Sequence, residues 1–260
     1  TIDEKIKIKK INEKIKKQIN NNKVNDLDIA ILACYEPIYK YKWSNKINRS
    51  INLAEIFKLQ YDDFKEEKKL SSTITPLKKI TDNISKKVKN QYEENPYPRW
   101  TNLGLSIESR DIKSVISDIN LNLDLQKIDF PDEPNILIAG CGTGQHAITT
   151  ASKFRKAKIY ALDLSFKSLA YAKRKTYEIG IKNIEFIQGD LLDLKIIDKK
   201  FDIIESVGVL HHMEDPLLGW QTLTNNLKEN SLMLIGLYSK IARTKISEIR
   251  KKIKELKIKT

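Results

Sequence analysis

The stretch NILIAGCGTGQHA, Asn135 to Ala147, decides the fold. A short apolar run leads directly into three glycines at alternate positions, Gly140, Gly142 and Gly144. The apolar run predicts a buried strand, and the segment after the glycines predicts a helix. Glycine suits a tight strand-to-helix turn because it has no side chain and tolerates positive φ. We therefore predict a strand, a bare loop and a helix N-terminus, an arrangement that suits an anionic group.

Four more apolar runs follow at intervals typical of strand–helix repeats. They are KIYALD at 158–163, IEFIQ at 184–188, FDIIESV at 201–207 and SLMLIGLY at 231–238. Helical segments separate them, at 144–154, 165–180 and 215–230. Strands that are apolar on both faces are covered on both sides, and strand–helix alternation predicts parallel crossovers. The sequence thus predicts an α/β fold with a doubly wound, Rossmann-like, mostly parallel sheet of five visible strands.

An α-helical segment is expected before this sheet. Ile8, Ile11, Ile15 and Ile19 fall on one helical face. Further along, Thr75 and Pro76 predict the N-cap and first turn of another helix, whose apolar stripe continues to Tyr92. We predict three parts: a helical N-terminal region at 1–90, an α/β domain at 91–240, and a basic amphipathic C-terminal helix at 241–260.

The net charge of +13 raises the question of a nucleic-acid partner. Residues 1–23 carry +5 and residues 240–260 carry +7, which leaves +1 for everything between. The excess therefore lies at the two ends and gives nucleic-acid binding only weak support. No apolar run is long enough for a membrane span, and two cysteines are too few for a disulfide framework. We expect a cytoplasmic protein.

The glycine loop also bears on the ligand. Dinucleotide enzymes use G-x-G-x-x-G, whereas this chain has G-x-G-x-G with Gln145 next. The shorter motif, together with acidic residues after the next two strands, resembles the class I S-adenosylmethionine-dependent methyltransferases. The resemblance implies S-adenosyl-L-methionine as cofactor. It also implies that the loop wraps the amino-acid end of that cofactor, through residues Ala139, Gly140, Cys141, Gly142, Thr143 and Gly144.

Two carboxylates follow neighbouring strands. Asp163, 23 residues after Gly140, is expected to accept both ribose hydroxyls of the cofactor, with Leu164 beside it. The alternative is that Asp163 caps the following helix. By the resemblance, Asp190 would meet the adenine amino group and Leu191 would flank the base. The alternative for Asp190 is an ordinary Gly-Asp turn.

The fourth strand leads into a segment that the resemblance places beside the transferred methyl group. Glu205, Ser206 and Val207 would run past the sulfonium. His211 and His212 follow, and His211 is a weak candidate for a catalytic base, since histidine titrates near neutral pH. A structural role for the histidines is the alternative. A metal site is not expected, because no further ligand set is visible.

The segment YEENPYPRW, 92–100, resembles the entry to methyltransferase domains of bacterial tetratricopeptide-repeat proteins. Its prolines stiffen an extended segment that could cover the cofactor. Arg99 is a candidate partner for the cofactor carboxylate, and Tyr97 is a weak catalytic candidate. Trp100 is expected mainly to pack. No tetratricopeptide pattern is present, so upstream repeat or helical modules are an open link.

The expected function is methyl transfer from S-adenosylmethionine to an unidentified protein or small-molecule acceptor. The alternatives are an RNA-directed methyltransferase that uses the basic ends, and a non-catalytic cofactor-binding or interaction module. The second alternative arises because the resemblance implies two more strands after the fifth, and the sequence predicts a basic helix there instead. The acceptor and the type of nucleophile cannot be read from the chain.

Overall fold

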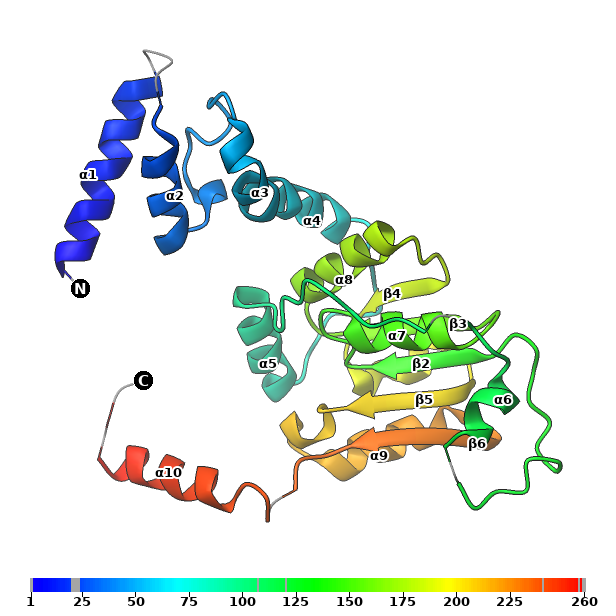
Figure 1. Cartoon of the computed structure of the whole chain (residues 1–260). Coiled ribbons are helices and arrows are strands. Elements are labelled where there is room, and N and C mark those ends of the chain that lie inside the picture. Colours follow the sequence, from blue (N-terminus) through cyan, green and yellow to red (C-terminus); the bar gives the residue numbers. More distant parts are fainter. Residues whose placement is uncertain are drawn as a thin grey trace. The chain divides into compact units, whose positions relative to one another are not determined.

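The structure, a computed structural model, describes residues 2–19, 24–106, 108–119, 121–239, 241–256 and 258. The chain divides into two compact units, residues 1–72 and residues 73–260. Residues 73–90, which are predicted to belong to the helical N-terminal region, lie in the second unit instead. Figure 1 shows the elements of both.

The first unit is helical and has its own apolar core. Its elements are α1 (Ile2–Ile19), α2 (Asp26–Tyr35), η1 (Ile38–Lys40), η2 (Ile51–Leu53), α3 (Ala54–Phe57), the π-helical turn η3 (Lys58–Asp62) and α4 (Asp63–Ser71). The predicted isoleucine stripe of α1 is confirmed: Ile15 is fully buried, and Ile8, Ile11 and Ile19 pack against the same core. Because α2 and the segments after it supply the rest of that core, the unit has a contiguous apolar core of its own.

The second unit holds a six-stranded sheet. Its strands are β1 (Thr75–Pro76), β2 (Asn135–Ala139), β3 (Lys158–Asp163), β4 (Ile184–Gln188), β5 (Phe201–Val207) and β6 (Leu227–Gly236). Their order is β1-β4-β3-β2-β5-β6, and each neighbouring pair is parallel. The predicted Rossmann-like parallel sheet is confirmed. The order reverses direction at β2, so a crevice opens beyond the carboxyl end of that strand.

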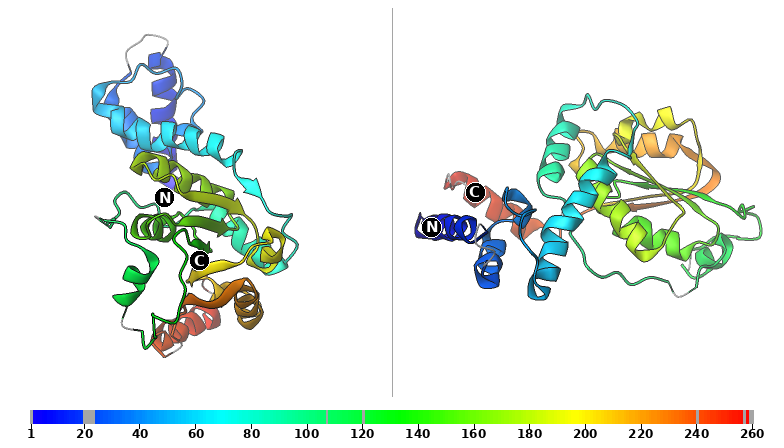
Figure 2. Two further views of the ribbon diagram at one scale, coloured as in Figure 1. Left: turned by 90° about the vertical axis from the view of Figure 1, so that its right-hand side faces the viewer. Right: turned by 90° about the horizontal axis from the view of Figure 1, so that it is seen from above.

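Helices cover both faces of this sheet, as Figures 1 and 2 show. Helices α7 (Gln145–Lys153) and α8 (Phe166–Ile179) lie on one face, and η4 (Leu191–Ile197), η5 (Leu210–His212) and α9 (Pro216–Asn225) lie on the other. The second unit also contains α5 (Asn83–Glu94), α6 (Ile112–Ser117) and α10 (Thr244–Glu255). Successive strand residues point to opposite faces. Leu137, Tyr160 and Leu162 therefore join the core that contains η4, η5 and α9 residues. On the other face, Trp100, Ile148 of α7 and Tyr171 of α8 form a separate cluster.

The prediction of a helix beginning at Thr75 is wrong. Thr75 and Pro76 form the short edge strand β1, paired with the end of β4. An edge position tolerates proline because one side of the strand needs no ladder donor. Helix α5 begins instead after Asp82, whose side chain accepts a hydrogen bond from the Ser85 amide at 2.7 Å. The sheet therefore has one strand more than the five predicted, and this additional strand, β1, precedes the glycine loop in sequence.

The last strand begins earlier than predicted. Residues 227–230, which the sequence assigns to the preceding helix, already belong to β6. Helix α9 ends at Asn225, and the Asn226 carbonyl accepts a bond from the Phe201 amide, so the chain turns straight into the sheet. A bulge follows, where the partner of β5 shifts from Leu227 to Leu232 between Phe201 and Ile203. The strand propensities of the residues do not predict such an irregular pairing.

Helix α10 confirms the predicted helix after the sheet. Among the residues described here, no antiparallel strand follows β6. Within the same ranges, no helix has both the length and the apolar character needed to cross a membrane.

Candidate functional site

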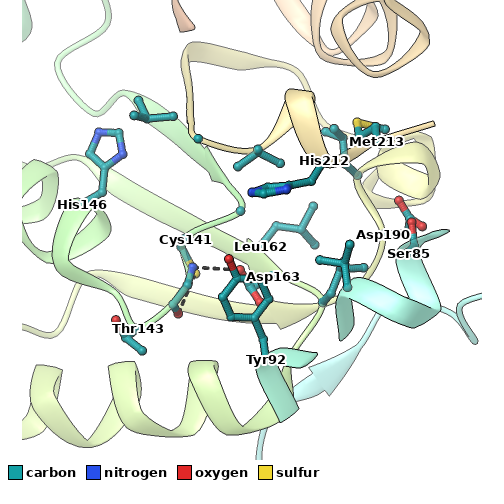
Figure 3. A pocket seen from close by; sticks show the side chains of 18 of the residues that line it. Ser85, Tyr92, Cys141, Thr143, His146, Leu162, Asp163, Asp190, His212 and Met213 are labelled. Carbon is teal, nitrogen blue, oxygen red and sulfur yellow. Dashed lines mark hydrogen bonds between the residues drawn. The ribbon is translucent and has the colours of Figure 1, made fainter. Parts of the chain in front are cut away.

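A cavity of about 330 Å³ lies at the carboxyl ends of the central strands, as Figure 3 shows from close by. This volume is in the range of about 300–1,000 Å³ found for small-molecule and cofactor sites. Its walls come from α5, the 92–100 segment, the glycine loop and the segments that follow β3, β4 and β5. The lining residues are Ile84, Ser85, Val88, Tyr92, Tyr97, Pro98, Gly140, Cys141, Gly142, Thr143, Gln145, His146, Leu162, Asp163, Leu164, Gly189, Asp190, Leu191, Val207, Gly208, Val209, His212 and Met213.

The three loop glycines have different reasons to be glycine. A Cβ on Gly140 would lie 2.3 Å from a methyl group of Val209, and one on Gly144 would lie 2.5 Å from Cβ of Ala172 in α8. A Cβ on Gly142 would meet no heavy atom within 4 Å. Close approach of a ligand therefore explains only Gly142. Gly140 and Gly144 are required for packing of the protein itself.

Asp163 connects the end of β3 to the glycine loop. Its Oδ2 accepts a bond from the Gly142 amide at 2.8 Å, and its Oδ1 accepts one from the Ser165 amide at 2.9 Å. Burial raises the pKa of the Asp163 carboxyl, although these amide bonds oppose the rise. The side chain still lines the cavity, and each carboxylate oxygen keeps further lone pairs for a ligand hydroxyl. The helix cap itself is Ser165, whose hydroxyl accepts from the Ser168 amide.

Asp190 occupies the matching position after β4. Its Oδ1 accepts from the Leu192 amide at 3.0 Å, so it caps η4 while it also lines the cavity. Leu191 beside it belongs to the buried core that supports this wall. The Gln188 side-chain amide donates to the Leu164 carbonyl at 2.9 Å and ties the ends of β3 and β4 together.

The 92–100 segment is bonded to the glycine loop. The Trp100 indole N–H donates to the Thr143 carbonyl at 3.0 Å, and the Thr143 hydroxyl donates to the Pro98 carbonyl at 2.7 Å. The Tyr171 hydroxyl of α8 donates to the Trp100 carbonyl. Buried, reciprocal bonds of this kind hold both backbones in one arrangement. We call residues 92–100 the strap.

The strap continues from α5, which forms one wall of the cavity. Ile84, Ser85, Val88 and Tyr92 face it at helical spacing. Figure 3 shows Tyr92 beside Asp163. Burial, followed by the nearby Asp163 charge, raises the pKa of the Tyr92 phenol. The Glu93 carboxylate accepts from the Phe166 amide at 2.6 Å, which fixes the end of α5 against the start of α8.

At the end of β5, a buried carboxylate binds α7. Oε2 of Glu205 accepts a bond from the Thr150 hydroxyl at 2.8 Å and lies 2.8 Å from Nε2 of His146. Glu205 is 9% exposed and does not line the cavity, whereas His146 does. Val207 follows on the same strand and lines the cavity with its half-exposed side chain.

The two adjacent histidines differ in position. His212 lines the cavity. The His211 ring lies between those of His212 and Tyr238, with centroids 4.3 and 4.0 Å away. Within the described residues, neither buried ring nitrogen of His211 has a hydrogen-bond partner. Burial lowers the pKa of His211, as do the charges of His212 and Arg243.

Several expected site residues do not line the cavity. Ala139 and Ser206 are buried in strands, and the Arg99 guanidinium lies over the Tyr171 ring at 4.5 Å. Three further expected residues are also absent from the cavity lining: Gly144, Glu205 and His211. The lining residues that sequence reasoning missed include Gln145, His146, Gly189, Gly208, Val209 and Met213. Of these, His146 carried a signal, because it lies two residues after the last glycine of the motif, in GQHA. Among the described residues, no cluster of three or more metal-ligating side chains occurs.

Comparison with known proteins bears on the same region. Residues 132–258 match the family model of a methyltransferase domain. The matched region begins just before β2 and includes α10, so it contains the glycine loop, Asp163 and Asp190. It leaves out α5 and the strap, which form the opposite wall of the cavity.

The curated relatives that match part of this chain have varied names. An uncharacterized protein of Synechococcus sp. is 37% identical over 46% of this chain and 29% of its own length. The malonyl-[acyl-carrier protein] O-methyltransferase of Halalkalibacterium halodurans is 33% identical over 45% of this chain and 44% of its own length. The chain thus spans less than half of either relative.

A solved structure also aligns with part of this chain. The magnesium protoporphyrin IX methyltransferase of Synechocystis PCC 6803 aligns with a TM-score of 0.47 and 19% identity, covering 65% of this chain and 78% of that one. The family match and the methyltransferase names support an S-adenosylmethionine-dependent methyltransferase. They name no common acceptor.

Proposed function

We propose that this protein transfers a methyl group from S-adenosylmethionine to a small-molecule or protein acceptor. The observation that carries the proposal is the position of Asp163. Its carboxylate lines the cavity and accepts a hydrogen bond from the amide N–H of Gly142. Gly142 is the loop glycine that has open space beside it. A hydroxyl-bearing ligand against this wall would meet a carboxylate and a bare backbone together.

The residues present fit the cofactor. Asp163 would accept the ribose hydroxyls, since a charge-assisted pair of bonds suits a diol. Asp190 would accept the adenine amino group, with Leu162 and Leu191 as apolar walls for the base. The loop at 140–143 would carry the amino-acid end. When bound, the cofactor supplies a methyl group on a sulfonium, and the protein supplies orientation and exclusion of water.

This assignment implies one orientation of the cofactor across the strand ends. Asp163 ends β3 and Val207 ends β5, whereas Asp190 follows β4 and the glycine loop follows β2; the strand order is β4-β3-β2-β5. A nucleoside held at Asp190 and Asp163 would therefore extend its remaining groups toward β2 and β5. We propose that the acceptor enters at the β5 side, near Val207.

Calorimetry with S-adenosylmethionine and its demethylated product tests the proposal. We expect Asp163→Ala to weaken both affinities at least tenfold, about 1.4 kcal/mol, because a charge-assisted pair of bonds is lost. Glu185→Ala, which removes a carboxylate ion-paired with Lys158 on the neighbouring strand, is the matched control and should bind as wild type does. Unchanged binding by Asp163→Ala would refute the ribose assignment.

The acceptor and the wider context also remain proposals. Incubation of small-molecule and protein fractions with tritiated cofactor would show which fraction takes up label. The strap supports kinship with methyltransferase domains of bacterial tetratricopeptide-repeat proteins, and through it a cytoplasmic, bacterial setting. If the acceptor were RNA, the protein would bind RNA with an affinity that falls as the salt concentration rises. An electrophoretic mobility-shift assay at two salt concentrations measures this.

A further inference from the structure

The pair formed by His146 and Glu205 is not used by cofactor binding as described above. His146 lies near the start of α7 and lines the cavity, and Glu205 is buried on β5. Nε2 of His146 lies 2.8 Å from Oε2 of Glu205, and the same oxygen accepts the Thr150 hydroxyl. A carboxylate that accepts from Nε2–H fixes one tautomer of a neutral imidazole. The lone pair is then on Nδ1.

The location of the pair suits the acceptor rather than the cofactor's nucleoside. Figure 3 shows His146 and Asp190 on opposite sides of the site. His146 reaches β5 through Glu205, and β5 is the side to which the proposed cofactor orientation points its methyl group. The other titratable side chains on the cavity wall are Tyr92, Tyr97, Cys141, Asp163, Asp190 and His212.

We propose that His146, oriented by Glu205, is the proton acceptor for a hydroxyl nucleophile. This inference rests on the proposed methyltransferase function and adds a substrate class to it. The hydroxyl oxygen forms a bond to the methyl carbon as the carbon–sulfur bond breaks. The electron pair of that bond stays on sulfur, which becomes a neutral thioether, and the hydroxyl proton moves to Nδ1 of His146. Glu205 is a positioning residue, since it acts through the imidazole.

A structural role is the competing explanation, because the same contacts attach α7 to β5. His146→Gln separates the two. A glutamine amide N–H can still donate to Glu205, but it offers no basic lone pair. His146→Ala loses both. If the role is catalytic, both variants lose activity, whereas only His146→Ala loses stability.

The kinetic test uses tritiated S-adenosylmethionine with a panel of phenols, alcohols and carboxylic acids. We expect His146→Gln to lower transfer to hydroxyl acceptors at least 100-fold, within the range of about 10²–10⁴ for general-base catalysis. Carboxylate acceptors need no base, so their methylation should fall less than threefold. The acid limb of the wild-type rate–pH profile should disappear in His146→Gln. Hydroxyl methylation within threefold of wild type, or activity confined to carboxylates, would overturn the proposal.

A second measurement needs no acceptor. The chain has three histidines, so the ring nitrogens of labelled protein are readily assigned by NMR with His146→Gln as reference. We expect the Nε2–H tautomer at His146 in wild type and a mixture in Glu205→Gln, because the amide can present either group. An Nδ1–H tautomer in wild type would refute the orientation. Calorimetry with the cofactor distinguishes the two proposals. If the wild-type protein does not bind S-adenosylmethionine, the methyltransferase function is refuted. If it binds the cofactor and His146→Gln methylates hydroxyl acceptors as wild type does, only the role of His146 as a base is refuted.

Discussion

At the scale of single residues, the site depends on which atoms each backbone position must accommodate. Gly142 has φ +52 and open space beside it, whereas Gly144 has φ +87 and Ala172 of α8 against it. Both need a left-handed conformation, but only Gly144 also needs the missing side chain for protein packing. The same motif therefore serves ligand access at one glycine and helix packing at another.

This difference predicts separate effects of two alanine substitutions. Gly142→Ala should cost about 1–2 kcal/mol of unfolding free energy, the penalty for a left-handed alanine. Gly144→Ala should cost about 2–4 kcal/mol, because overpacking against Ala172 adds to that penalty. Urea unfolding measures both. Gly142→Ala should also weaken cofactor binding, since its methyl group would occupy the cavity wall. Equal losses of stability would contradict the packing assignment of Gly144.

His211 predicts a pH dependence of stability. Its pKa in the folded protein is lowered by burial and nearby charges, relative to about 6.5 in an unfolded chain. Below that pH the unfolded chain binds more protons, so stability is present above about 6.5 and is lost as the pH falls toward the folded pKa. We expect a smaller loss of unfolding free energy between pH 7.5 and 5.5 in His211→Phe than in wild type. Identical losses would show that His211 does not contribute.

At the scale of elements, the strap determines the shape of the glycine loop. It crosses to the loop through Trp100 and Thr143 and to α8 through Tyr171. The expectation that Trp100 packs is met by its cluster with Ile148 and Tyr171. The indole N–H adds a bond that sequence reasoning did not foresee. A tryptophan thus gives the loop both apolar support and a donor.

Trp100→Phe tests that bond, since phenylalanine keeps an aromatic ring and loses the donor. Leaving the buried Thr143 carbonyl unpaired should cost about 1–3 kcal/mol of unfolding free energy. The looser loop should also bind cofactor more weakly, by threefold or more in calorimetry. Trp220→Phe, on the 41% exposed Trp220 of α9, is the matched control. Similar behaviour of the two variants would argue against the strap as a support of the loop.

At the scale of the whole molecule, the chain consists of two units with separate cores. The first has a core of isoleucine, leucine and aromatic side chains that come from its own residues. Every residue that lines the cavity belongs to the second unit, residues 73–260. The boundary follows Ser72, so α5 and β1 belong with the sheet.

We therefore expect a protein containing only residues 73–260 to bind S-adenosylmethionine within threefold of the full chain. The physical reason is that α5, the strap and all the strand ends remain. Calorimetry on both proteins, with circular dichroism to verify folding, is the measurement. A folded but non-binding 73–260 protein would show that the first unit contributes to the site.

The sequence by itself determined the parallel sheet, because five of its six strands contain apolar runs bounded by turn residues, and Gly140 to Gly144 mark its central loop. It also indicated Asp163 and Asp190, since their position after a strand places them at one edge of the sheet. It missed β1, because Thr75 and Pro76 imitate a helix start and only pairing with β4 makes them a strand.

Only the tertiary structure decided which side chains share a wall. His146 and Glu205 are 59 residues apart in sequence and meet because the fold brings the start of α7 within side-chain reach of β5. His211 and His212 are adjacent, yet the turn of η5 puts one in the cavity wall and the other behind it. Local patterns determine where elements lie along the chain. The contacts between distant elements, which burial and hydrogen bonding select together, determine what faces the ligand.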